Sequence, residues 1–133
     1  MLSVETVSYR YIVNDEYTKL LMAKRGLRQG DPLSPMIFVL VMDYLYRILQ
    51  KLKSNPNFNF HANCEKLGII NLSFADDLLL FSRGDSGSVN ILLQSFNNFS
   101  SSTGLGANPM KCRIYFGNVN MKEKDDIKKI TTF

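Results

Sequence analysis

Two adjacent aspartates, Asp76 and Asp77, lie between two apolar stretches, and this pattern constrains how the chain can fold. Short apolar runs bounded by turn-forming residues are typical of β-strands, and aspartate is a common turn residue. The pattern therefore predicts a hairpin in which strands at residues 68–74 and 78–82 are joined by an acidic turn. Because both flanks resemble buried strands, we expect the turn to lie close to the hydrophobic core.

The acidic turn has two interpretations. An ionised carboxylate near a core is costly unless it is paired or bound to a metal, and adjacent residues of a straight strand point to opposite faces. At a tight turn this alternation relaxes, so that Asp76 can bind a metal while Asp77 supports it. Carboxylate oxygens favour Mg²⁺ or Mn²⁺, but a two-metal phosphoryl-transfer centre needs a further carboxylate. The alternative is an exposed hairpin turn that is acidic because aspartate favours turns.

Upstream of the acidic turn, the sequence predicts a hairpin and a long helix. Alternating residues at 4–13 and a second run at 17–23 flank a turn that begins at Asn14. Asp31 and Pro32 are typical of a helix N-terminus, because aspartate accepts free backbone N–H groups and proline suits the first helical position. The apolar residues that follow recur at three- and four-residue steps and predict one buried face. They are Leu33, Ile37, Leu40, Val41, Tyr44, Leu45, Ile48 and Leu52.

Downstream of the acidic turn, the pattern predicts a second amphipathic helix, a short strand and a charged tail. The helix covers residues 89–99 and places Phe96 and Phe99 in the core. The strand lies at residues 112–116, and a charged helical tail lies at residues 122–129. The order of strands, helix, strand–turn–strand, helix and strand favours an α+β fold, in which an antiparallel sheet carries its helices on one face.

Composition narrows the class of protein without identifying it. A chain of 133 residues, 45% apolar and 21% charged, is long enough for one core and argues against disorder. The net charge of +4 favours an anionic partner only weakly. The two cysteines form no disulfide framework, so we expect reduced thiols and an intracellular protein of the nucleus or cytoplasm. We expect no signal peptide and no membrane partner, since the apolar run at residues 36–42 is too short to span a bilayer.

A second motif, at residues 25–35, combines arginines, glycines and a helix start. Arg25 and Arg28 suit contacts to phosphate groups, Gly30 has no side chain to hold a ligand away, and a helix N-terminus attracts anions. The same residues would also serve as an ordinary helix-capping loop. Lys111, after a glycine-rich turn, would act as a general acid or phosphate contact, or as a solvated surface lysine.

Taken in order, these segments resemble a reverse transcriptase of the LINE-type (non-LTR) retrotransposons of plants. The resemblance is carried by Arg25-Gly26-Leu27-Arg28-Gln29-Gly30-Asp31-Pro32-Leu33-Ser34-Pro35, by Phe74-Ala75-Asp76-Asp77, by Gly104-Leu105 with Asn108 and Lys111, and by residues 113–117. It covers essentially the whole chain. It implies a polymerase palm with some adjoining fingers, which would perform RNA-directed DNA synthesis on an RNA template and a DNA primer. It also implies dNTP substrates and a two-metal site for Mg²⁺ (or Mn²⁺).

The resemblance assigns a role to each motif. Asp76 would coordinate metal, Asp77 would complete the catalytic pair, and Lys111 would approach the triphosphate. Phe74 would pack near the primer end, and Gln29 would lie beside the incoming nucleotide and template. The implied nucleotide- and template-binding set is Arg25, Arg28, Gln29, Gly30, Phe74 and Ala75.

One departure from the family bears on activity. The family requires a third aspartate from an upstream strand–helix unit, which we expect to lie before Met1. We therefore expect a partial domain that is inactive alone. It would comprise a fingers/palm hairpin and loop at 1–30, the palm core at 31–117 and the start of a truncated segment at 118–133. Two alternatives remain: a non-catalytic nucleic-acid-binding remnant that uses the arginines of the first motif and the lysine-rich tail, and a functionless pseudogene product.

Overall fold

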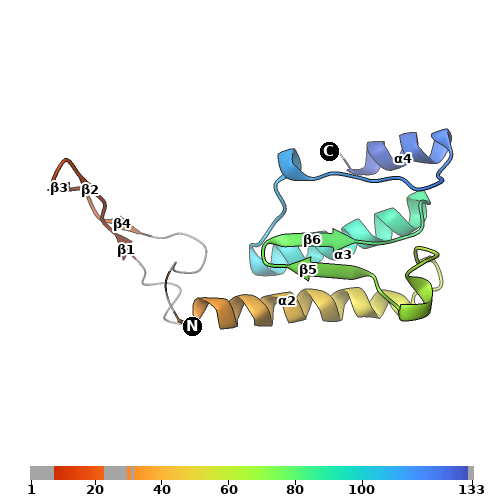
Figure 1. Ribbon diagram of the computed structural model, residues 1–133, viewed down its shortest axis with the longest axis horizontal. Coiled ribbons are helices and arrows are strands. Elements are labelled where there is room, and N and C mark those ends of the chain that lie inside the picture. Colours follow the sequence, from red (N-terminus) through yellow and green to blue (C-terminus); the bar gives the residue numbers. More distant parts are fainter. Residues whose placement is uncertain (1–7, 23–29, 31, 132–133) are drawn as a thin grey trace. The chain divides into compact units, whose positions relative to one another are not determined.

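The structure, a computed structural model, describes residues 8–22, 30 and 32–131 (Figure 1). The chain divides into two compact units, Met1–Leu40 and Val41–Phe133. The long helix α2, Ser34–Gln50, contributes its first turns to the first unit and the rest to the second. No helix in the described part of the chain is both long and apolar enough to cross a membrane.

The first unit contains the predicted N-terminal hairpin. Strand β1 (Ser8–Tyr9) pairs with β4 (Leu21–Met22), and β2 (Ile12–Val13) pairs with β3 (Glu16–Tyr17), both antiparallel. The turn residues Asn14 and Asp15 have φ values of 51° and 62°. Positive φ at both central residues matches the twist of a two-residue hairpin loop, and Asn and Asp tolerate it better than most side chains. The predicted hairpin and its turn are thus confirmed.

Helix α2 begins at Ser34, three residues after the predicted cap. Asp31 lies outside the described residues, so its capping role stays a prediction. The helix buries Leu45 and Leu49, and the short 3-10 helix η1 (Lys51–Ser54) continues from it. Leu33, Leu40 and Tyr44, which the periodicity placed on the buried face, are exposed. The prediction was wrong for these three residues: the apolar cluster against which α2 packs starts only at Val41, and Tyr44 lies at its edge, with its ring 6.2 Å from that of Phe99.

The acidic motif forms the predicted hairpin. Strand β5 (Asn71–Phe74) pairs with β6 (Asp77–Leu80), and the register sets Phe74 opposite Asp77. The first strand is shorter than predicted, because the 3-10 helix η2 (Glu65–Leu67) precedes it and Gly68 bends the chain at a φ of 59°. This positive φ favours glycine; a Cβ at position 68 would also stand 2.8 Å from Lys53 Nζ, the mobile end of a side chain that can move aside.

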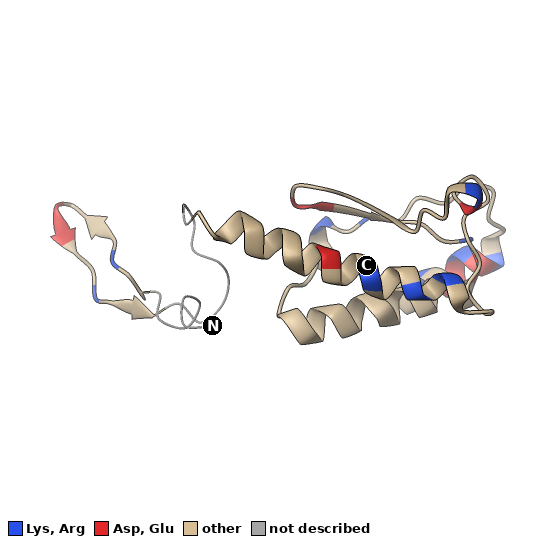
Figure 2. Cartoon of the chain, turned by 90° about the horizontal axis from the view of Figure 1, so that it is seen from below, with Lys and Arg blue, Asp and Glu red and all other residues tan. Residues whose placement is uncertain are grey.

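The core of the second unit lies between the hairpin and two helices. Figures 1 and 2 together show the hairpin on one side, with α2 and α3 (Ser86–Thr103) behind it. Leu78 and Leu80 of β6 pack inward against this core. Phe99 is buried and Phe96 packs beside it, with ring centroids 6.1 Å apart, as predicted. The buried cluster consists of Leu45, Leu49, Leu52, Phe58, Ile70, Leu92 and Phe99.

Helix α4 (Met121–Thr131) packs against α3 and is part of the fold. It was predicted as a charged tail, but its Ile127 is only 1% exposed. The carboxylate of Glu123 accepts a hydrogen bond from the Ser86 backbone N–H (3.0 Å) at the start of α3. Asp85 caps the same helix end by accepting from the Ser88 N–H (2.8 Å). Helix α4 therefore stabilises the N-terminus of α3.

The predicted strand at residues 112–116 is absent. The 3-10 helix η3 (Pro109–Lys111) comes first, and an extended segment then runs to α4 without a strand partner among the described residues. Burial still alternates along it: Cys112, Ile114 and Phe116 are half-buried, while Arg113 and Tyr115 are exposed. The segment therefore alternates as a strand does, but a strand also requires a neighbour with which to form hydrogen bonds.

Candidate functional site

The hairpin turn holds Ala75 in a strained backbone conformation. Ala75 and Asp76 form a two-residue loop, and Ala75 has a φ of 50°, whereas the φ of Asp76 is not positive. Positive φ at the first central residue alone is the pattern of a type II′ turn, which favours glycine at that position. An L-residue in the left-handed region costs about 1–2 kcal/mol. Strain of this kind is often found at functional sites.

We expect Ala75→Gly to stabilise the second unit. Glycine relieves the left-handed strain, while its greater freedom in the unfolded chain offsets about 0.5–1 kcal/mol of that gain. The net expected change is a rise of about 0.5–1 kcal/mol in the free energy of unfolding, measured by urea denaturation. Ala107→Gly, in an exposed loop without positive φ, is the matched control and should lower stability instead. A loss of stability in both variants would contradict the strained turn.

Asp76 and Asp77 are exposed, so the expectation that they lie near the core was wrong. Only the β6 face that carries Leu78 and Leu80 packs against the helices. The opposite face is open, and Phe74 beside the turn is 83% exposed. The apolar flanks indicated the hairpin correctly, but they could not indicate that just one of its faces is covered.

The two carboxylates have oxygens free for a ligand. Neither the Asp76 nor the Asp77 side chain makes a hydrogen bond or ion pair with another described residue. Exposed, unpaired carboxylate oxygens on neighbouring residues suit a hard cation such as Mg²⁺ or Mn²⁺, which keeps several waters and takes one or two carboxylates. Within residues 8–22, 30 and 32–131, no group of three or more His, Cys, Asp or Glu residues is placed to hold a metal. The donor set therefore fits a divalent cation in part.

Apart from Lys111, the other predicted site residues fall into three groups. Phe74 and Ala75 lie with the two aspartates at the tip of one hairpin. Arg25, Arg28 and Gln29 lie outside the described residues, so their roles stay predictions. Gly30 is described: it is exposed, in a turn of the first unit, with a φ of 79° that favours glycine.

Lys111 lies at the end of η3, which the Asn108 side chain caps by accepting from the Met110 N–H (3.0 Å). The Lys111 backbone N–H bonds the Asn108 carbonyl at 2.9 Å, while its side chain is exposed. In Figure 1, the hairpin turn and η3, the short blue helix between α3 and α4, both lie at the left-hand end of the second unit.

Comparison with known proteins identifies the family. The profile of the reverse transcriptase (RNA-dependent DNA polymerase) family matches residues 2–129. The chain therefore belongs to the reverse transcriptase family. No solved structure matches it.

Three similar proteins illustrate the relationship. The Pol polyprotein of the type-2 retrotransposable element R2DM of Drosophila melanogaster is 41% identical over 88 residues, which are 66% of this chain and 8% of that protein. The Pol polyprotein of a type-1 retrotransposable element R2 of Popillia japonica is 35% identical over 101 residues, 76% of this chain and 16% of that protein. An uncharacterised mitochondrial protein of Arabidopsis thaliana is 39% identical over 70 residues, 50% of this chain and 56% of that protein.

Proposed function

We propose that the chain is a catalytic palm segment of an RNA-directed DNA polymerase that adds dNTPs to a DNA primer on an RNA template. The observation that carries the proposal is the hairpin tip, where Asp76 and Asp77 present unpaired carboxylates on a strained turn. Membership of the reverse transcriptase family and similarity to R2 Pol polyproteins support it. The finer assignment is to a LINE-type element of a plant; the Arabidopsis relative supports only the plant origin.

The proposed fold is a polymerase palm, with β5 and β6 as part of a larger antiparallel sheet that carries α2 and α3 on one face. The packing of Leu78 and Leu80 against the helices supports this arrangement. Residues 1–30 supply a hairpin and loop of the fingers and palm, and residues 31–117 supply the palm core.

In the proposed mechanism, the residues of the chain position the reactants. Divalent cations, when bound, would stabilise the attacking and leaving oxygens of the transferred phosphoryl group. Asp76 and Asp77 would hold them at the hairpin tip, and the exposed ring of Phe74 would support the primer end. Lys111 would neutralise charge on the triphosphate. The loop with Arg25, Arg28, Gln29 and Gly30 would bind the nucleotide and template.

Metal binding by the hairpin tip can be measured directly. We expect the 133-residue chain to bind Mn²⁺ weakly. Electron paramagnetic resonance of the free Mn²⁺ measures this binding. The double variant Asp76→Asn/Asp77→Asn should weaken it by at least about tenfold, since even outer-shell partners of a metal contribute that much. The chain offers a control in the adjacent pair Asp125 and Asp126 on α4, of which Asp126 is paired with Lys129. An equal loss of Mn²⁺ affinity in Asp125→Asn/Asp126→Asn would reject the hairpin tip as the metal site.

Primer extension tests the activity of the isolated chain. Because the hairpin tip supplies only two carboxylates, we expect no extension on an RNA template above the background of Asp76→Asn, with either Mg²⁺ or Mn²⁺. Robust extension that disappears in Asp76→Asn would show that this chain is active by itself and would overturn the proposed inactivity.

A further inference from the structure

We propose that the extended segment after η3 presents a second nucleic-acid contact, in which Tyr115 stacks on a base of a single strand and Arg113 binds its phosphate. This surface is distinct from the hairpin tip. The inference rests on the proposed function only for the class of partner, and its test requires neither metal nor catalysis.

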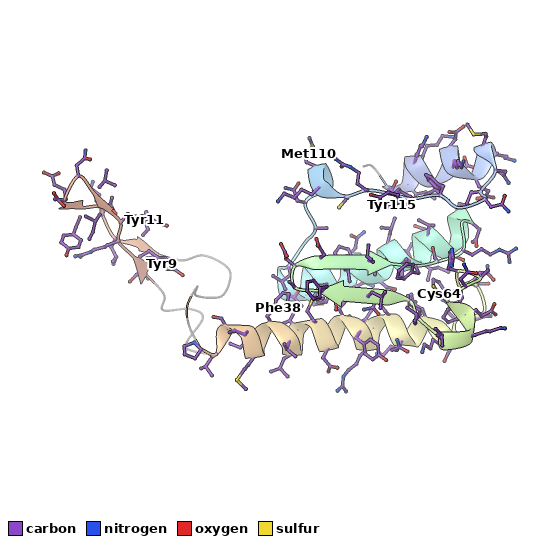
Figure 3. All side chains as sticks on the ribbon, in the orientation of Figure 1. Tyr9, Tyr11, Phe38, Cys64, Met110 and Tyr115 are labelled. Atoms are coloured by element: carbon purple, nitrogen blue, oxygen red, sulfur yellow. The ribbon has the colours of Figure 1, made fainter. Side chains whose placement is uncertain are left out.

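Tyr115 has the geometry of a stacking platform. Its side chain is 88% exposed, the highest value among the large apolar and aromatic side chains of the described residues. It lies on the segment between α4 and η3, the short helix that carries Met110 (Figure 3). An aromatic ring that is fully exposed yet carried by an ordered segment provides a face for a base, and stacking tolerates any base.

Contacts of the residues on both sides of Tyr115 restrict the backbone that carries the ring. Before it, Arg113 Nη1 donates to the carbonyls of Cys112 (2.8 Å) and Met110 (3.1 Å). After it, the ring of Phe116 lies under Lys124 of α4, with Nζ 5.9 Å from the ring centroid. Preorganisation of this kind reduces the entropy that binding must overcome.

Arg113 supplies the phosphate contact. Its Nη1 is occupied by the two carbonyls, while Nε and Nη2 have no partner among the described residues. Arg113 and Tyr115 lie on the same exposed face, two residues and about 6.6 Å apart in an extended chain. A cation beside an exposed aromatic ring is the combination with which proteins bind single strands without sequence preference.

The sequence around this surface carries basic residues and no acidic ones. No Asp or Glu occurs between Asp85 and Glu123, whereas Lys111, Arg113 and Lys122 all fall in that interval. Figure 2 shows α3, which makes up half of the interval, with neither basic nor acidic colouring. Glu123, the first acidic residue after this interval, accepts a hydrogen bond from the Ser86 backbone N–H. Within this stretch of the chain, a polyanion therefore meets basic side chains that have no acidic neighbours in sequence.

The test is binding of fluorescent oligo(dT) and oligo(rU) by the 133-residue chain, measured by anisotropy in EDTA over a salt series. We expect Tyr115→Ala to weaken binding about tenfold without changing the salt slope, since stacking releases no counterions. We expect Arg113→Gln to lower the slope of log K against log salt by about 0.7, the value for one phosphate of a single strand. Both oligonucleotides should respond alike, because neither contact uses the 2′-hydroxyl.

Matched controls separate this surface from general effects of charge and aromatic content. Tyr46→Ala removes an exposed tyrosine of α2, and Lys51→Gln removes an exposed cation of η1; neither should change affinity or slope by a comparable amount. Binding that is unchanged in Tyr115→Ala, or equal binding of duplex DNA, overturns the proposal. If the chain binds single strands as expected but shows no Mn²⁺ site at the hairpin tip, the proposed function is contradicted and the stacking surface is not.

Discussion

Ile127→Ala should lower the free energy of unfolding by about 3 kcal/mol. Ile127 lies on α4 with only 1% of its surface exposed, where α4 packs against α3. Truncation of a buried isoleucine removes transfer free energy and leaves a cavity, which together typically cost 2–5 kcal/mol. The expected loss is large because α4 is a structural helix of the second unit, although its sequence is mostly charged. Urea denaturation followed by circular dichroism measures it.

The same helix supplies the control. Ile130→Ala makes the same chemical change three residues later, at a side chain that is 37% exposed, and should cost clearly less. If Ile127→Ala leaves too little folded protein to measure, Ile127→Val should still cost about 0.5–1.5 kcal/mol. Equal small effects at both positions would mean that α4 behaves as a solvated tail in solution.

Gly84→Ala should cost about 1–3 kcal/mol, and a second substitution should relieve it. A Cβ on Gly84 would overlap Val119 Cγ2 and stand 3.4 Å from Val119 Cβ and Cγ1. Overpacking of this kind forces side chains or backbone to shift. The contact joins the segment before α3 to the segment before α4, so the shift would also disturb the bond between the Ser86 N–H and Glu123.

A double-mutant cycle identifies the clash as the cause. Val119→Ala removes both Cγ atoms, so Gly84→Ala should cost less than about 0.5 kcal/mol in that background, a non-additivity expected of residues in contact. Gly106→Ala, at a glycine where a Cβ would meet nothing within 4 Å, should be close to neutral. If the stability costs of the two substitutions are additive, the cost of Gly84→Ala comes from the backbone conformation at position 84 and not from contact with Val119.

Features set by neighbouring residues could be predicted from the sequence. The turn at Asn14 and Asp15 and the hairpin around Asp76 both follow from a pair of turn-forming residues between apolar runs. Phe96 and Phe99 were placed in the core by helical spacing alone, and the structure agrees. In each case the chain within about ten residues contains the physical cause, so a single sequence suffices.

Features that depend on distant partners could not be predicted. The openness of one hairpin face, and hence the exposure of Asp76, depends on which elements lie beside the hairpin. The segment at 112–116 alternates as a strand would, but its hydrogen-bonding neighbour cannot be read from its own residues. Burial of Ile127 depends on α3, and the need for glycine at position 84 depends on Val119, 35 residues away. The strained φ of Ala75 had a local signal, the two-residue turn, but glycine is the residue that usually marks it.

The hairpin of β5 and β6 is a two-stranded ladder among the described residues, and this affects how the two aspartates fluctuate. A ladder of this size opens locally at a lower free energy than the helical core beneath it. Since Asp76 and Asp77 adjoin the same short turn, one opening event displaces both carboxylates together, and closure restores both. A ligand that binds the closed hairpin would therefore shift this equilibrium and order the tip as a single unit.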